Sequence, residues 1–311
     1  MLSKRVTLFG LLKAAAILTI LFSVLTSFDF AHRNIELFSH FRLQYLVASS
    51  VLLAAFAIFR SPVYMVPLLA TVLLNASYVL PWYFGGTLVE SDTTLKLLHA
   101  NIFRGNDQYD RLLKLVETEQ PDIIFLQEFS PEWLNATKPL LVGYPFSYVE
   151  PREDAFGIAL FSRLTLDSVT HVDSPPFNYP TIVATLTLNG ESITLISTHA
   201  MVPLGRFNYE ARNEQLQSVT ETARQATGAV ILTGDFNTTV WARPYRELEE
   251  RTGLRNTRRG FGILPTWPTF MPVAMIAIDH ALVSRDIGVV ETRTGPRIGS
   301  DHLPLIITVA L

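Results

Sequence analysis

The 311-residue sequence contains no cysteine, which excludes a disulfide framework, a thiolate metal site and a cysteine nucleophile. Charged residues are also scarce: they make up 17% of the chain, whereas soluble domains average about 25%. The sequence has no internal repeat and no low-complexity segment. Apolar residues account for 49% of the chain, which excludes an intrinsically disordered protein. The chain therefore folds, and part of it is unusually apolar.

The charges that are present are distributed unevenly along the chain. Residues 1–84 carry six lysines and arginines against two acidic residues, a net charge of +4. Residues 85–311 hold the remaining 19 basic and 26 acidic residues, a net charge of −7. Because the longest apolar runs also lie before residue 85, the two parts are predicted to have different surroundings.

Three apolar runs in the first part are predicted to span a membrane: residues 6–28, 41–59 and 62–84. A bilayer core of about 30 Å needs about 20 helical residues. Lys13 and Arg42 lie near the ends of their runs, where a long side chain reaches the membrane surface. The third run ends in a Trp-Tyr-Phe sequence, which is typical of the aromatic belt at that surface. A cleaved signal peptide is the alternative for the first run, but no cleavage site stands out after it.

Lysines and arginines near the spans predict the orientation of the chain in the membrane. Lys4, Arg5, Lys13 and Arg60 would share one side, which is the more positive of the two. We therefore place the N-terminus in the cytoplasm. Three crossings then put residues 85–311 outside, facing the periplasm or the exterior, in a multi-pass protein of the cell (inner) membrane.

The second part, residues 94–311, follows a linker at 85–93 and has the pattern of an α/β domain. Apolar runs typical of strands recur with helical segments between some of them, and an Asn-Gly turn predicts a hairpin. The predicted strands are 95–101, 122–128, 156–162, 181–188, 192–200, 229–237, 274–284 and 303–311, and the predicted helices are 107–119 and 208–225. Many strands with few helices favour sheets stacked on each other and covered by helices.

Polar side chains recur where these predicted strands end or begin. Alone, each has a simpler interpretation, since asparagine commonly forms turns, a Gly-Asp-Phe-Asn sequence can cap or turn the chain, and a histidine can pack beside a strand. Core packing does not explain carboxylates and histidines at six strand ends, and loops at a sheet edge commonly present catalytic groups. The six motifs are NI (101–102), LQE (126–128), STH (197–199), GDFN (234–237), IDH (278–280) and SDH (300–302).

Together these motifs resemble the endonuclease/exonuclease/phosphatase superfamily, over residues 94–311 and in the family's order. The combination with apolar spans is similar to the layout of teicoplanin-resistance membrane proteins. The resemblance implies a four-layer α/β sandwich, in which two packed mixed β-sheets are flanked by helices, preceded here by three transmembrane helices. It also implies metal-assisted hydrolysis of a phosphate ester or anhydride by in-line attack of water.

The resemblance further implies a role for each matched residue. Glu128 would bind a divalent metal, with Asn101 beside it and Asp301 completing the surroundings of the metal or the histidine. Oxygen ligands without cysteine suit Mg²⁺, or Mn²⁺, better than Zn²⁺. His302 would be the general base or the group that protonates the transition state, and Asp279 would orient it.

Three more residues would act directly on the phosphate or the attacking water. Asp235 would align the water, Asn237 would steady a phosphoryl oxygen, and His199 would donate to a non-bridging oxygen as negative charge builds. His280 receives no role, because a histidine packed within a strand is the favoured interpretation there.

Three classes of function remain open from the sequence. Anchoring raises the effective concentration of the site against lipids, which favours an envelope lipid phosphate such as a lipid-linked pyrophosphate or a phospholipid headgroup. An extracytoplasmic nuclease is the alternative; its usual basic face conflicts with the net charge of −7, although four arginines cluster at positions 251–259. A non-catalytic binding protein would have lost a ligand or the histidine. The bilayer is the expected partner, and no protein partner is inferred.

Overall fold

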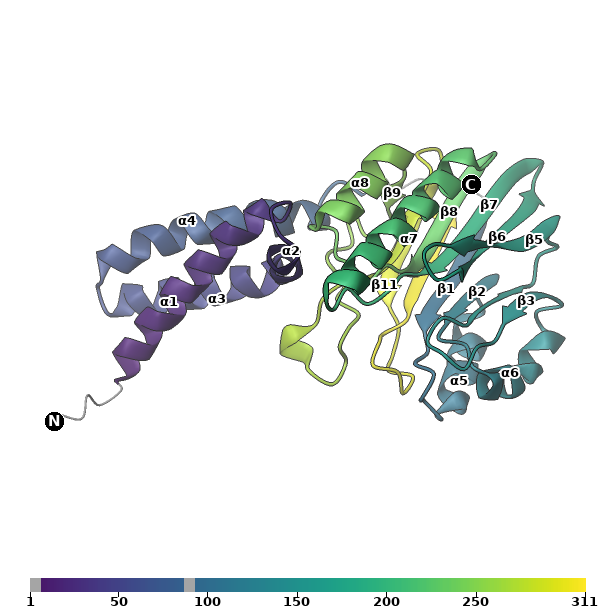
Figure 1. Cartoon of the computed structure of the whole chain (residues 1–311), viewed down its shortest axis with the longest axis horizontal. Helices are drawn as coiled ribbons and strands as arrows, with labels where there is room; N and C mark the ends of the chain where they lie inside the picture. The colour runs from purple at the N-terminus through teal and green to yellow at the C-terminus, as the bar shows by residue number, and fades with distance from the viewer. Residues whose placement is uncertain (1–6, 87–92) are drawn as a thin grey trace. The chain divides into compact units, whose positions relative to one another are not determined.

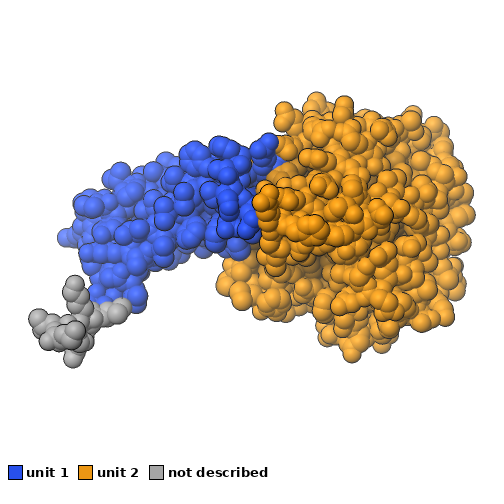
Figure 2. All heavy atoms as spheres, in the orientation of Figure 1, with its two compact units in different colours: residues 1–81, 241–243 blue, residues 82–240, 244–311 orange. Residues whose placement is uncertain are grey.

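The computed structural model describes residues 7–86 and 93–311, which form two compact units (Figure 2). The first unit comprises the chain up to Pro81 together with Trp241–Arg243, and the second comprises Trp82–Val240 and Pro244–Leu311. Each unit has its own hydrophobic core. Of the linker expected at 85–93, residues 87–92 lie outside the described residues.

The first unit is built from helices. They are α1 (Leu8–Leu25) with η1 (Thr26–Phe28), α2 (Arg33–Ser39), α3 (Arg42–Ile58), and α4 (Pro62–Val79) with η2 (Leu80–Tyr83) (Figure 1). By length and composition, Leu8–Phe28 and Pro62–Tyr83 are each able to cross a membrane. The second expected span, residues 41–59, corresponds to α3, which has only 17 residues. It adds a third candidate only when counted with α2, from which it bends by 65°.

The first unit buries several polar side chains beside its small apolar core and exposes many apolar side chains. Arg42 is buried, and its guanidinium donates to the Ser23 carbonyl (2.9 Å) and to Asn75 Oδ1 (3.3 Å). Asn75 in turn donates to the Ser23 hydroxyl (2.9 Å). Leu8 and Val63 are among the many exposed apolar residues. Helices in lipid associate through close packing and such interhelical hydrogen bonds, so this distribution is typical of a membrane-embedded bundle.

The second unit contains two six-stranded mixed sheets. The first sheet has the strand order β11-β12-β1-β2-β4-β3, and the second has the order β5-β6-β7-β8-β10-β9. The strands are β1 (Thr94–Asn101), β2 (Ile123–Gln127), β3 (Phe146–Glu150), β4 (Ile158–Ser162), β5 (Ser168–Ser174), β6 (Tyr179–Leu188), β7 (Glu191–His199), β8 (Ala229–Asp235), β9 (Arg255–Asn256), β10 (Asp279–Val283), β11 (Gly288–Thr294) and β12 (Leu305–Ala310). At the centre of each sheet, one pair of strands is parallel: β1 with β2, and β7 with β8.

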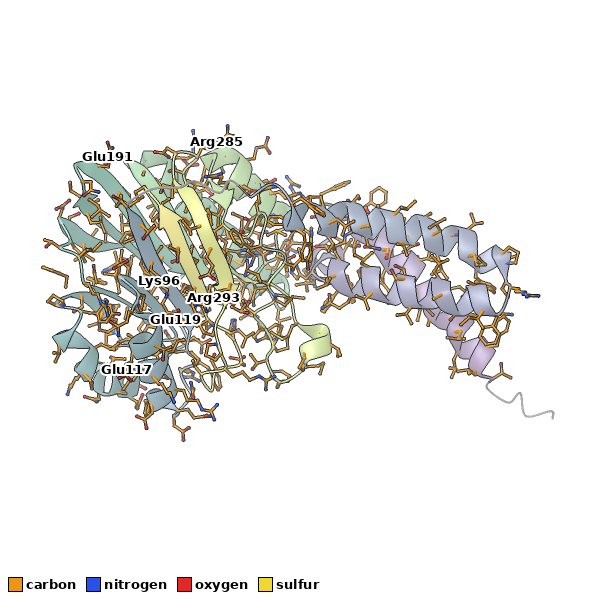
Figure 3. The ribbon with its side chains drawn as sticks, turned by 180° about the vertical axis from the view of Figure 1, so that it is seen from behind. Lys96, Glu117, Glu119, Glu191, Arg285 and Arg293 are labelled. Atoms are coloured by element: carbon orange, nitrogen blue, oxygen red, sulfur yellow. The ribbon has the colours of Figure 1, made fainter. Side chains whose placement is uncertain are left out.

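Helices cover the outer faces of both sheets (Figure 1). They are α5 (Tyr109–Glu119) and α6 (Pro131–Ala136) on the first sheet, with η3 (Lys138–Val142) after α6, and α7 (Arg206–Gln225) and α8 (Arg243–Thr252) on the second. Glu119 at the end of α5 accepts from Lys96 (2.7 Å) and Arg293 (2.6 Å), which ties the helix to β1 and β11 (Figure 3). The predicted four-layer α/β sandwich is confirmed.

The sequence did not predict four of the strands, and all four are edge strands: β3, β5, β9 and β11. An edge strand is largely exposed, so it lacks the long apolar run that marks a buried strand. Helices α6 and α8 were also not predicted. The strand expected at 274–284 is shorter, because Pro272–Ala274 forms a 3₁₀ turn (η4) and β10 begins only at Asp279.

Side-chain alternation along the central strands explains where the core ends. In β1, Leu95 and Leu97 pack between the sheets, whereas Leu98 and Ala100 pack beneath the helices. Successive side chains point to opposite faces, so His99 and Asn101 continue the inward face of β1. The inward positions change from apolar to polar toward the carboxyl end in all four central strands: Leu97-His99-Asn101, Phe125-Gln127, Leu195-Ser197-His199 and Ile231-Thr233-Asp235.

Replacing Phe125 with alanine is expected to lower the free energy of unfolding of the domain strongly. The phenyl ring is fully buried between the sheets, and such a truncation costs about 3–5 kcal/mol. Urea unfolding of the full chain in detergent micelles, followed by tryptophan fluorescence, measures the change. The matched control is Val142→Ala on the surface, expected to stay within about 0.5 kcal/mol of the parent. Equal effects of the two variants would contradict this assignment of the core.

Candidate active site

One edge of the sandwich collects all the residues that the motifs single out. The carboxyl ends of β1, β2, β7 and β8 lie at this edge. Strands β10 and β12 run antiparallel to β8 and β1, so their first residues reach the same edge. The predicted residues brought together there are Asn101, Glu128, His199, Asp235, Asn237, Asp279, Asp301 and His302.

Asp279 is fully buried and accepts hydrogen bonds from two histidines. Its Oδ2 lies 2.8 Å from His302 Nδ1, and its Oδ1 lies 3.2 Å from His99 Nε2. Burial alone would raise the pKa of Asp279, but the charge and hydrogen bond of His302, followed by those of His99, hold it well below its usual value. The carboxylate is therefore ionised and fixes the orientation of both rings.

Asp235 lies between two buried histidines, His199 and His302. Its Oδ2 lies 3.5 Å from His199 Nε2 and 3.7 Å from His302 Nε2, and it accepts from Asn101 Nδ2 at 3.2 Å. Its Oδ1 accepts from the backbone N–H of Asn237 at 2.9 Å. The side chain of Asn237 turns to the backbone, where Nδ2 donates to the Ala200 carbonyl (2.9 Å).

Glycine precedes Asp235 because the neighbouring strand leaves no room for a side chain. A Cβ at Gly234 would lie 2.1 Å from the Thr198 carbonyl oxygen of β7. The close approach of β7 to β8 therefore requires glycine at this position.

The two histidines beside Asp235, His199 and His302, both have raised pKa values. Burial disfavours the charged form of His302, but Asp279 and then Asp235 outweigh it and raise its pKa to about 10. For His199, burial is likewise outweighed, here by the hydrogen bond and charge of Asp235 and the charge of Glu128. His199 Nδ1 donates to the Ala155 carbonyl at 2.9 Å. Both rings are thus favoured as cations that can donate a proton.

Glu128 offers carboxylate oxygens that fit a divalent metal, whereas Asn101 turns its Nδ2 toward Glu128 and its Oδ1 accepts from the backbone N–H of Phe103 (3.0 Å). Glu128 is half-buried, and its carboxylate accepts from Asn101 Nδ2 (3.0 Å) and from the backbone N–H of Arg104 (3.1 Å). Its backbone is left-handed, with φ at 60°, a conformation that costs about 1–2 kcal/mol for such a residue and is found at functional sites. Hard oxygen donors at an accessible carboxylate suit Mg²⁺.

A second group, Asp235, Asp279 and His302, brings three ligand atoms within 4.8 Å of one another. Both oxygens of Asp279 already accept from histidines, and His302 Nδ1 holds one of them. A cation at these three atoms would have to displace that hydrogen bond. These three atoms are therefore less available to a cation than the carboxylate of Glu128.

Asp301 lies at the rim of the site and is held by a tryptophan. Its Oδ2 accepts from Trp267 Nε1 at 3.0 Å, and its charge acts on His302. The backbone carbonyl of Asp301 accepts from Thr269 N (2.8 Å). These contacts fix the loop that precedes β12 beside the catalytic histidine.

Two residues that organise the site received no role from the sequence: Gln127, which stood only within the LQE motif, and His99, which was not singled out. Gln127 Oε1 accepts from the Asp235 N–H (2.9 Å), and its Nε2 donates to the Thr198 carbonyl, so one side chain joins the two sheets. His99 reaches across to Asp279. Both stand at inward positions of strands that are otherwise apolar there, and this interruption is the signal that could have identified them.

His280 packs within the fold, as the sequence predicted. Its Nδ1 accepts from Arg258 (2.9 Å) and Asn256 (3.2 Å), and its Nε2 donates to the Thr238 carbonyl (2.8 Å). Burial and then the charge of Arg258 hold its pKa well below the usual value, so the ring is neutral.

Several solved structures share this fold at low sequence identity. *D. rerio* TDP2 complexed with single-strand DNA product has 17% identity and a TM-score of 0.59, covering 71% of this chain and 100% of its own. The human Nocturnin catalytic domain with bound sulfate has 20% identity and a TM-score of 0.58, covering 70% and 93%. *Bacteroides thetaiotaomicron* mannosyl-6-phosphatase has 21% identity and a TM-score of 0.56, covering 70% and 100%.

A search of the curated proteins finds no match to the sequence. The model of the Endonuclease/Exonuclease/phosphatase family, however, matches residues 98–302, which is more than half of the chain and includes all eight predicted site residues. The resemblance to this family is therefore confirmed, while the membrane-anchored type stays a prediction. The chain belongs to the endonuclease/exonuclease/phosphatase family and is a metal-dependent hydrolase of phosphate ester or anhydride bonds.

Proposed function

We propose that the chain is a membrane-anchored phosphohydrolase that cleaves the phosphate ester or anhydride of an envelope lipid by in-line attack of water. The observation that carries the proposal is the buried Asp279–His302 pair beside the accessible Glu128, in a chain that also has two helices able to cross a membrane. A bilayer anchor raises the local concentration of lipid substrates at the site.

Glu128, to which Asn101 donates, would hold Mg²⁺ or Mn²⁺, and Asp301 would complete the surroundings of the metal or of His302. A divalent cation polarises a phosphoryl oxygen and neutralises charge that develops on it. The carboxylate of Glu128 receives only N–H donors from the described residues, so its remaining lone pairs are available to a cation.

His302 acts as the proton donor of the reaction rather than as its base. With a pKa of about 10, the ring keeps its proton at neutral pH. Asp279 holds Nδ1, which leaves the Nε2–H to protonate or hydrogen-bond the phosphoryl oxygen in the transition state. Of the two roles that the family resemblance leaves open for His302, this favours protonation of the transition state over action as the general base.

Asp235, His199 and Asn237 complete the surroundings of the phosphate. Asp235 aligns the attacking water and accepts its proton, since its Oδ2 lies between the Nε2 atoms of His199 and His302. His199 donates from Nε2 to a non-bridging oxygen. Asn237 uses one amide hydrogen on Ala200, and its second remains for a phosphoryl oxygen.

The four arginines that favoured a nuclease are engaged within the protein. Arg251 pairs with Glu221, and Arg259 pairs with Glu249 at 3.2 Å. Arg258 is buried against His280, and Arg255 donates to the Ile287 carbonyl. A nonspecific nuclease needs free cations along its binding face, so the lipid phosphate is favoured and the nuclease is the second candidate.

Replacing His302 with asparagine is expected to reduce turnover about 10²–10⁴-fold, the contribution typical of a positioned proton donor. The full chain in detergent is assayed with Mg²⁺ or with EDTA, for phosphate release from undecaprenyl pyrophosphate and for nicking of plasmid DNA. The control is His171→Asn on the exposed strand β5, which should keep full activity.

The two assays separate the candidate functions. Mg²⁺-dependent phosphate release that is lost in His302→Asn supports the lipid phosphohydrolase. DNA nicking without lipid turnover would replace it with the nuclease. Equal activity of His302→Asn and the parent would refute the assigned role of the histidine.

Replacing Glu128 with glutamine is expected to raise the Mg²⁺ concentration needed for half-maximal activity at least ~10-fold, because even losing a supporting group around a metal has that effect. A Mg²⁺ titration of the rate measures the shift. Glu132→Gln, on the neighbouring helix α6, is the control and should leave the titration unchanged. An unshifted curve for Glu128→Gln would exclude this residue as a metal ligand.

The orientation in the membrane is testable by labelling, because the chain has no cysteine of its own. In spheroplasts, a membrane-impermeant maleimide is expected to label Glu191→Cys in the catalytic domain. It should label Arg60→Cys, in the turn between α3 and α4, only after permeabilisation. The reverse pattern would place the catalytic domain in the cytoplasm.

A further inference from the structure

Two segments beside the site expose large apolar side chains that hydrolysis does not require. One segment follows β7 and His199 and runs into the first turn of α7, and the other is the loop that precedes β10 and lies against Asp301. We call these side chains the apolar rim: Val202, Leu204, Phe207, Phe270, Met271 and Val273. Exposed apolar side chains gathered in this way mark an interaction surface.

The loop of residues 268–275 has the sequence PTFMPVAM and carries no charged side chain. An antiparallel bridge between Trp267 and Ile276 closes its base, and the Thr269 N–H donates to the Asp301 carbonyl (2.8 Å). Within this closed loop, Phe270 is 70% and Val273 is 83% exposed. The backbone thus presents apolar side chains outward at a fixed position beside the site.

Aromatic rings from other segments connect Phe207, in the first turn of α7, to the site. The Phe156 ring lies 5.1 Å from the His199 ring and stacks on Tyr179 at 3.5 Å between centroids. Phe177 contacts Tyr179 (5.3 Å) and Phe207 (5.4 Å). A series of aromatic rings therefore leads from the catalytic histidine to the exposed rim.

We propose that the apolar rim inserts into the surface of the lipid bilayer and that a lipid substrate reaches the site along it. This rests on the proposed function, since it assumes an anchored domain. The described part of the chain has two apolar helices able to cross a membrane. Only ten residues separate Tyr83 from β1, which extend at most ~35 Å. The domain is thereby confined near a bilayer, which makes lipid the occupant best supplied to this surface.

Another exposed apolar pair, Leu141 and Val142, provides a direct comparison. It lies at the opposite edge of the sandwich, close to Tyr144, whose hydroxyl donates to the Pro121 carbonyl just before β2. Val142 is the same residue type as Val273 and is more exposed, at 93% against 83%. If apolarity alone decided which surface enters the bilayer, this edge would insert as readily as the rim, whereas our proposal expects only the rim to insert.

The test uses single cysteines in the full chain, which has none of its own. Val273→Cys and Val142→Cys are each labelled with the fluorophore NBD and reconstituted into vesicles of phosphatidylcholine and phosphatidylglycerol. Doxyl-labelled phosphatidylcholine then quenches fluorophores that enter the bilayer, and aqueous iodide quenches those in water. We expect doxyl quenching at position 273 to be several-fold stronger than at position 142, with the opposite order for iodide.

Each other result would overturn the proposal. Iodide quenching of both positions would mean that the rim faces water, and stronger doxyl quenching at position 142 would place the opposite edge on the membrane. Protection of position 273 from both quenchers would mean that protein, such as a second copy of the chain, covers the rim. The readout needs no catalysis, so a wrong substrate or a wrong catalytic residue leaves it intact.

Discussion

The site depends on hydrogen bonds that cross from one sheet to the other where the apolar core ends. Polar groups at inward positions are shielded from water, so leaving one unpaired is costly, and several of them find partners in the opposite sheet. Gln127 satisfies the backbone of β7 and β8, Asn101 reaches Asp235, and His99 reaches Asp279. These bonds join the two sheets at the edge where the catalytic groups stand, so the sandwich and the site are held by the same contacts.

Asp279 shows how burial and chemistry are combined in this arrangement. An isolated carboxylate at zero exposure would be strongly disfavoured, and burial does act to raise its pKa. Histidines from β1 and from the loop before β12 compensate with two hydrogen bonds, one to each oxygen. The resulting pair holds a proton on His302, whereas the neutral His280 beside a buried arginine cannot serve as a proton donor to substrate.

The sequence predicted the central strands and the side chains that gather at their carboxyl ends. It did not predict the edge strands of the two sheets, or residues such as His99 that position another side chain. Central strands are buried on both faces and give long apolar runs, whereas β5 is mostly exposed and β11 is only partly buried, so neither does. Asn101 and Asp235 were predictable because they stand at strand ends within recognisable motifs. His99 was not, because its meaning depends on Asp279, 180 residues away in the chain. Likewise, the bend between α2 and α3 has no signal in hydropathy, which measures composition and not direction.

The charge of the catalytic domain bears differently on the two candidate substrates. A nucleic acid presents a row of phosphates to the whole domain. Residues 85–311 carry a net charge of −7, so the domain as a whole repels them. A single phosphate interacts mainly with groups within a Debye length of about 8–10 Å, where His199 and His302, both with raised pKa values, stand among the carboxylates of Asp235, Asp279 and Glu128. Because the carboxylates outnumber the two histidines, attraction of a lone headgroup would depend on the divalent cation that Glu128 is proposed to hold, while the apolar rim would accommodate what is attached to the phosphate. An acidic domain whose site needs such a cation and has apolar surroundings suits a phosphate that comes on a lipid.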